Sequence, residues 1–221
     1  MAVTVQSLSR LPFFAGLGED ALLEIASHLQ ERTFSPAQVI ILEGEPCEAV
    51  YFVAQGLVRT RRMSLEGREQ VLAYLGPGEW FNLVPALDGG PNLASVEAVS
   101  STTLYTIPCR RLRRIMSDHL DVVLAVSKHL AAEVRRLSDM VEDLALHTVR
   151  VRLARFLLAQ AEGTLPPQGW TQQEIAARIG TVREMVGRTL RAFADEGLIH
   201  RQRGRVVVVD REGLEREANG A

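Results

Sequence analysis

Three arginines and one glutamate in the C-terminal part of the chain have the types and spacing needed to read a nucleic acid. They fall on one face of a predicted helix and are Arg183, Glu184, Arg188 and Arg191. A guanidinium can donate paired hydrogen bonds to O6 and N7 of guanine, and a carboxylate can accept one from the amino group of cytosine. Gly187 is expected to leave a gap on the same face. This face therefore predicts a helix that enters the major groove of double-stranded DNA.

Two short helices joined by a tight turn are expected to position this face. Thr171 and Glu174 form the capping-box pattern that starts a first helix, which Gly180 ends. Thr181 and Glu184 repeat the pattern and are expected to start the second helix. Such a pair is typical of a helix-turn-helix. The residues of the pair expected to contact DNA are Thr171, Gln172, Thr181, Val182, Arg183, Glu184, Gly187, Arg188 and Arg191.

A basic β-hairpin is expected to follow the second helix. Its strands are predicted at residues 198–200 and 206–209, and its turn carries Arg203. A guanidinium in this turn would contact DNA phosphates, as the wing of a winged helix does. The alternative is a charged, solvated helix on an ordinary helical domain, and the wing and a dimer seam argue against that alternative.

The segment from about residue 117 to residue 160 contains no glycine or proline and predicts an unusually long helix. Apolar residues within it alternate at spacings of four and three, which is the a/d pattern of a coiled coil. We expect this dimer seam to pair two copies of the chain, and the alternative is packing against the β domain of the same chain. The seam consists of Leu130, Val134, Leu137, Val141 and Leu144.

Short runs of β-branched and aromatic residues lie between Thr33 and Ile107, with glycine-containing turns beside them. Many short strands at this interval predict a small antiparallel barrel or sandwich. A short amphipathic helix is expected before them, at residues 19–31. No Ser/His/Asp arrangement, phosphate-binding loop or carboxylate pair stands out in the sequence, so an enzyme is not expected.

The composition places the chain among globular proteins. Its 221 residues suffice for two ordinary domains, and 47% are hydrophobic and 24% charged. The net charge of −2 combines an acidic first half with a basic second half. The apolar runs are too short to cross a membrane and no signal peptide is evident, so a cytoplasmic protein without a membrane partner is expected. Cys47 and Cys109 lack a CxxC spacing, and neither a metal site nor disulfide chemistry is expected of them.

Nearly the whole chain resembles the CRP/FNR family of bacterial transcription regulators. The resemblance rests on residues 180–190 (GTVREMVGRTL), which are similar to the recognition helix of the catabolite activator branch, and on residues 75–81 (LGPGEWF). It implies an α+β fold in three parts. These are an N-terminal antiparallel β-roll, similar to a cyclic-nucleotide-binding domain, in residues 1–116, a long dimerisation helix in residues 117–147, and a C-terminal winged helix-turn-helix in residues 148–221.

The resemblance also implies partners and residue roles. The chain would be a homodimer on palindromic DNA with TGTGA-like half-sites and would act together with RNA polymerase. Arg183 and Arg188 would each contact a guanine, and Glu184 would accept from a cytosine amino group. A second reading is a ligand-binding regulatory module that acts on a protein partner and uses the helix-turn-helix for docking. The sequence does not decide between activator and repressor.

The family places an effector pocket between the β-roll and the long helix. Its members that bind cyclic AMP have a Gly-Glu pair and an Arg-Ser pair there, whereas this chain has Asn82-Leu83 and Asn92-Leu93. Without the arginine, a buried cyclic phosphate would be an unpaired charge. An effector other than cyclic AMP, or none, is therefore expected. The pocket would be lined by Phe81, Asn82, Leu83, Asn92, Leu93, Leu137 and Ser138.

Other cofactors have weaker support in the sequence. An iron–sulfur cluster of the FNR type needs several cysteines near the N-terminus, and the first cysteine is Cys47. A haem stays open because histidines are available, although histidines at helix positions are usually surface or core residues. The histidines available are His28, His119, His129 and His147.

The departures at Asn82-Leu83 and Asn92-Leu93 predict that the protein does not bind cyclic AMP at micromolar concentration. The reason is that the pocket has too few polar groups to compensate a buried phosphate. Isothermal titration calorimetry with cyclic AMP should give no saturable heat. Micromolar binding, or a sharp rise of DNA affinity with cyclic AMP, would contradict this.

Overall fold

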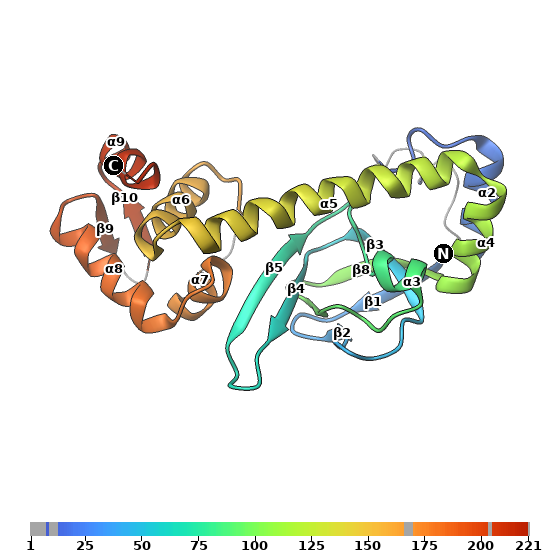
Figure 1. Cartoon of the computed structure of the whole chain (residues 1–221), viewed down its shortest axis with the longest axis horizontal. Helices are drawn as coiled ribbons and strands as arrows, with labels where there is room; N and C mark the ends of the chain where they lie inside the picture. Colours follow the sequence, from blue (N-terminus) through green and yellow to red (C-terminus); the bar gives the residue numbers. More distant parts are fainter. Residues whose placement is uncertain (1–7, 9–12, 166–169, 203–204, 221) are drawn as a thin grey trace. The chain divides into compact units, whose positions relative to one another are not determined.

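The computed structural model describes residues 8, 13–165, 170–202 and 205–220 (Figure 1). The chain divides into two compact units, one of residues 1–62 and 72–134 and the other of residues 63–71 and 135–221. Within the described ranges, no helix is long and apolar enough to cross a membrane.

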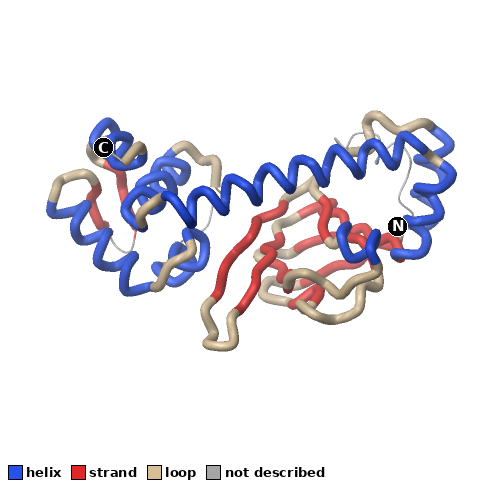
Figure 2. The backbone as a smooth tube through the Cα atoms, in the orientation of Figure 1, coloured by secondary structure: helices blue, strands red, loops and turns tan. Residues whose placement is uncertain are grey.

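Two four-stranded sheets form the β-roll, and their described pairings are antiparallel, which confirms the predicted class. Figure 2 shows the strands in red. The first sheet has the order β1-β8-β3-β6 and the second the order β2-β7-β4-β5. The strands of the first sheet are β1 (Gln30–Phe34), β3 (Ala49–Gln55), β6 (Trp80–Phe81) and β8 (Thr102–Pro108), and those of the second are β2 (Val39–Ile41), β4 (Val58–Met63), β5 (Glu69–Leu75) and β7 (Ser95–Ala98).

Apolar side chains fill the β-roll and attach helices to its first sheet. Val53, Val58 and Leu104 are completely buried in the cluster that the strands share. In a second cluster, Trp80 lies against Phe14, with ring centroids 5.5 Å apart, and the helices add their own apolar faces. Burial of such large side chains is the main favourable term in the folding of this unit. The helices involved are α2 (Glu19–His28), α3 (Leu83–Asp88), α4 (Cys109–Asp118) and the first part of α5 (Leu120–Leu146).

The predicted continuous helix over residues 117–160 is wrong in detail, because the chain forms three successive helices there. His119 has extended backbone angles between α4 and α5. Thr148 begins α6 (Val149–Ala161), and its side chain accepts a hydrogen bond from the amide of Val151. A threonine in this position caps free amides that an uninterrupted helix would have paired.

The second unit holds a helical domain with a two-stranded hairpin. Its core joins Leu153, Ile175, Val186, Phe193 and Leu214, all buried. The hairpin pairs β9 with β10 in antiparallel register. These elements agree with the predicted winged helix-turn-helix. They are α6, α7 (Gln172–Ile179), α8 (Arg183–Asp195), β9 (Ile199–Gln202), β10 (Arg205–Val208) and α9 (Arg211–Ala218).

Arg150 holds three helices of this unit together. Its guanidinium donates to the carboxylates of Glu196, just after α8, and of Glu217 on α9. The same guanidinium lies 4.8 Å from the centre of the Phe193 ring. The Arg150 interaction holds the pKa of Glu217 below its usual value. This three-way contact ties the C-terminal end of α8 to α6 and α9.

Candidate nucleic-acid interface

The turn between α7 and α8 depends on Gly180. Its φ of +70° lies in the left-handed region, and the amide of the next residue, Thr181, donates to the carbonyl of Ala176 at 2.9 Å. A Cβ atom at this position would come within 2.2 Å of Leu144 Cδ2. Arg152 donates from Nη1 to the carbonyls of Ile179 and Gly180. Only glycine fits this turn without strain, as the helix C-cap pattern predicts.

The first capping box is confirmed. The amide of Thr171 donates to Glu174 Oε2 at 2.8 Å, and Thr171 Oγ1 accepts from the amide of Glu174 at 3.2 Å. The two reciprocal bonds satisfy donors that the start of α7 would otherwise leave unpaired.

The second capping box is wrong. The N-cap of α8 is Val182, and no side chain accepts a hydrogen bond from the amides that follow it. Thr181 is buried and belongs to the turn that closes α7, so it is not placed as a DNA-contacting residue. The prediction failed because the left-handed Gly180 shifts the start of α8 by one residue. Among the described residues, no hydrogen bond or ion pair engages Glu184, so its carboxylate is available to a ligand.

One face of α8 presents the predicted charged residues, and Arg183, Glu184 and Arg188 lie in the first half of the helix. Val182, Arg183, Glu184, Arg188 and Arg191 are all exposed. In the described part of the chain, none of the three arginines forms an ion pair. They differ in this from Arg150 and Arg155, which have carboxylate partners. A set of exposed, unpaired guanidiniums at the start of a helix is suited to phosphates and guanine edges.

Gly187 was predicted to lie on that face, but the structure places it elsewhere. It is buried, and a Cβ atom there would come within 3.0 Å of Gln172 Oε1. Helical spacing alone could not show that the N-terminal end of α7 approaches α8 at this point. Gln172 is accordingly half-buried, whereas Thr171 is exposed. Gly187 therefore serves the packing of the two helices and not a gap toward DNA.

The hairpin after α8 carries an exposed cation that the sequence interpretation did not select. Arg201 on β9 is exposed and lies opposite Val206 on β10. The predicted phosphate contact, Arg203, lies outside the described residues. Arg201 was missed because the expected strand ended at residue 200, whereas β9 continues to Gln202.

Most of the predicted dimer seam on α5 is exposed. Val134 and Val141 are 66% and 65% exposed, and Leu137 and Leu144 are also exposed. Leu130 differs, because it is half-buried against the core of its own β-roll. The first position of the seam thus follows the alternative reading, in which the stripe packs on its own domain.

The asparagines predicted to line an effector pocket bind to the protein itself. Asn82 Nδ2 donates to Asn92 Oδ1 and to the carbonyl of Ala49, each at 3.0 Å. Asn92 is buried and donates to the carbonyl of Leu42. Asn82 also has a left-handed φ of 69°, which asparagine tolerates better than most residues. The pair fixes loops of the β-roll, and its role toward a ligand stays a prediction.

The other pocket residues differ in burial. Phe81 is buried and stacks on Tyr51 with ring centroids 4.9 Å apart, and Leu83 is buried in the helix-facing core. Leu93 is 54% exposed. Leu137 and Ser138 are exposed on the part of α5 that groups with the second unit.

Two of the four histidines that leave a haem open lie beside carboxylates. His119 Nε2 lies 2.9 Å from Glu24 Oε2, and His147 lies 3.8 Å from Asp143. Across the described ranges, no group of three His, Cys, Asp or Glu side chains could hold a metal ion.

Comparisons with known proteins cover both units. A family model described as a cyclic nucleotide-binding domain matches residues 31–119, and one described as a Crp-like helix-turn-helix domain matches residues 151–217. The cyclic AMP receptor protein of Thermus thermophilus is 35% identical over 219 residues, covering 95% of this chain and 97% of that protein. A CRP-like cAMP-activated global transcriptional regulator of Mycobacterium tuberculosis is 29% identical, with coverages of 96% and 98%.

A solved structure agrees with these sequence relatives. It is a transcriptional regulator of the crp/fnr family from Eubacterium rectale, with a TM-score of 0.80 and 26% identity. The match covers 94% of this chain and 98% of that chain. The sequence comparisons and the structural comparison therefore identify similar proteins over nearly the whole length of the chain.

Substitutions in the two capping-box sequences, Thr171–Glu174 and Thr181–Glu184, are predicted to affect stability differently. Thr171→Ala should lower the free energy of unfolding by about 1 kcal/mol, because it removes a cap that is present. Glu184→Ala should change it by less than about 0.5 kcal/mol, because no cap involves that carboxylate. Urea denaturation followed by circular dichroism measures both. An equal loss in the two variants would show that Glu184 does cap α8.

Proposed function

This chain belongs to the CRP/FNR family of bacterial transcription regulators, and we propose that it acts as a homodimer on palindromic DNA with TGTGA-like half-sites. Members of this family are DNA-binding regulators and not enzymes. As such a regulator it would act in the cytoplasm and would influence RNA polymerase at the promoters it binds.

The exposed N-terminal face of α8 is the observation that carries the proposal. Arg183, Glu184 and Arg188 lie on it at spacings of one and four residues. When the start of a recognition helix enters the major groove, side chains at such spacings reach neighbouring base pairs. Arg183 and Arg188 would donate to guanines and Glu184 would accept from a cytosine, which matches a TGTGA-like half-site.

The exposed seam on α5 supports a dimer. A single helix leaves Val134, Leu137 and Val141 in water, and pairing with a second copy would remove this apolar surface from solvent. The alternation of four and three is the spacing with which two parallel helices interlock. A dimer would also hold two recognition helices at a fixed separation, which a palindrome with half-sites about 34 Å apart requires.

Control by an effector other than cyclic AMP is the third part of the proposal. The relatives from Thermus thermophilus and Mycobacterium tuberculosis are named for cyclic AMP. In this chain, Asn82 and Asn92 occupy positions where the resemblance predicts the nucleotide-binding groups, and they hydrogen-bond to each other. Neither side chain carries a charge that could pair with a phosphate.

The competing function is a module that docks on a protein partner through the helix-turn-helix. Salt separates the two, because each neutralised phosphate releases counterions and DNA affinity falls steeply as salt rises. A shallow salt dependence together with DNA affinity no better than that of an unrelated acidic polymer would favour the protein partner.

Arg188→Ala should weaken binding to a TGTGA-palindrome duplex by about 1 to 3 kcal/mol and relax the preference at one base pair in each half-site. The reason is the loss of a bidentate contact to guanine. Selection from duplexes with randomised half-sites measures the preference, and fluorescence anisotropy measures the affinity.

Arg203→Ala is the matched control for that experiment. A wing arginine contacts phosphates, so its loss should weaken all duplexes roughly equally. If Arg188→Ala also weakens all sequences equally, α8 does not read bases.

Leu137→Asp should give monomers that lose operator binding, because it places a charge in the middle of the seam. Sedimentation velocity measures the state of association. Leu146→Asp is the control, since Leu146 is 73% exposed on α5 but lies off the seam, and it should remain dimeric. A Leu137→Asp variant that is still a dimer would place the interface elsewhere.

A further inference from the structure

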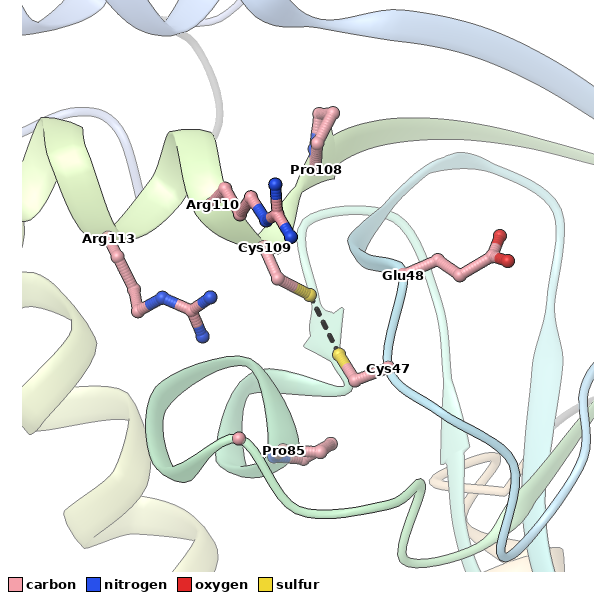
Figure 3. Close-up of a pocket in the computed structure, with 8 residues that line it drawn as sticks. Cys47, Glu48, Pro85, Pro108, Cys109, Arg110 and Arg113 are labelled. Carbon is pink, nitrogen blue, oxygen red and sulfur yellow. Dashed lines mark hydrogen bonds between the residues drawn. The ribbon is translucent and has the colours of Figure 1, made fainter.

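Both cysteines of the chain lie at one pocket of the β-roll (Figure 3). The pocket has a volume of about 460 Å³, which is ample for a small solute, and both thiols line it. Cys47 is half-buried and Cys109 is buried. The Arg110 and Arg113 side chains of α4 also line this pocket.

The two sulfur atoms are unusually close. Cys47 Sγ and Cys109 Sγ lie 2.8 Å apart and share a hydrogen bond, although the residues are 62 positions apart in the sequence. The antiparallel ladder of β3 and β8 brings them together, because it pairs Ala49 with Pro108. The amide of Cys109 then donates to the carbonyl of Glu48 at 3.0 Å. Cys47 lies in the loop that leads into β3 and Cys109 directly follows β8, so the end of this ladder and the hydrogen bond beyond it set their proximity.

The surroundings keep a proton on the pair. Burial, together with the hydrogen bond to Cys109, raises the pKa of the Cys47 thiol to about 12, and the nearby Arg113 guanidinium acts in the opposite direction. Cys47 therefore retains its proton at neutral pH and can donate it to the sulfur of Cys109. Asn82 Nδ2 lies 3.4 Å from Cys47 Sγ and orients that sulfur.

The distance between the sulfurs favours a covalent bond over a shared metal ion. Two thiolates on one tetrahedral zinc, each about 2.3 Å from it, lie about 3.7 Å apart, which is wider than this pair. A disulfide bond is about 2.05 Å long, so the two sulfurs need to approach by less than about 1 Å.

We propose that Cys47 and Cys109 form an oxidation site that hydrogen peroxide converts to a disulfide within one chain. One thiol gives up its proton, its sulfur attacks a peroxide oxygen and the O–O bond breaks. The sulfur becomes a sulfenic acid, and the departing hydroxide takes up the thiol proton as one water. The second thiol attacks the sulfenic sulfur, the S–S bond forms, and the hydroxyl leaves with the thiol proton as a second water. The protein loses two electrons and two protons, and the peroxide takes up both.

The full-length protein offers a direct test because it contains only these two cysteines. After treatment with hydrogen peroxide, the thiols titratable in denaturant should fall from two to none, the intact mass should fall by two hydrogen atoms, and the chain should run as a monomer on a non-reducing gel. Dithiothreitol should restore both thiols. Closing a loop of this length should raise the Tm by on the order of 10 °C.

Matched controls use the same chain. Cys47→Ser and Cys109→Ser should each retain one thiol that dimedone traps as a sulfenic acid and should show no rise in Tm. The wild-type chain unfolded in urea should form the disulfide at least about tenfold more slowly, because it has lost the sheet that aligns the sulfurs.

Three results would overturn the proposal. These are two thiols that persist in the folded protein while the unfolded chain is oxidised, a gain of oxygen atoms in place of the loss of hydrogen, and a disulfide between chains. The folded-against-unfolded comparison remains decisive even if a serine variant fails to fold.

Discussion

The backbone at Gly180 lies so close to the Leu144 side chain that no Cβ atom fits between them. The position of the exposed arginines on α8 depends on this close packing. A left-handed residue there ends α7, sets the start of α8 at Arg183, and brings Leu144 into contact with the turn. Arg152 pairs with the two carbonyls at the end of α7. The exposed positions of Arg183 and Arg188 follow from where α8 begins. A residue with a side chain at position 180 would therefore disturb the recognition face without touching it.

Local patterns predicted the features that depend on a few neighbouring residues. The Thr171–Glu174 box formed as expected because both partners lie within one turn of α7. The alternating strands likewise formed an antiparallel β-roll. The exposed arginines of α8 were predictable because one stripe of apolar residues fixes which face of that helix is buried.

Tertiary contacts determine the features that the sequence patterns did not predict. Thr181 begins a second capping-box sequence, but it belongs to the turn that closes α7, and α8 has Val182 as its N-cap. Gly187 lies at a helical position that faces outward only until α7 packs over it. Cys47 and Cys109 have no meaningful spacing along the chain, and only the pairing of β3 with β8 makes them neighbours. All three features depend on contacts between segments, and no periodic pattern in the sequence indicates such contacts.

One apolar stripe on α5 serves two surfaces. Leu130 belongs to the core of the β-roll, whereas Val134 and the seam residues after it are exposed and would meet a second copy in the proposed dimer. Because both surfaces belong to one continuous helix, a change in the packing of the β-roll around Leu130 would change the free energy of association of the proposed dimer. Such coupling is reciprocal. A molecule that raises the association constant of the proposed dimer by a given factor would bind the dimer more tightly than the monomer by the same factor. In the proposed dimer, dilution of the protein would then lower its apparent affinity for any effector that strengthens the association.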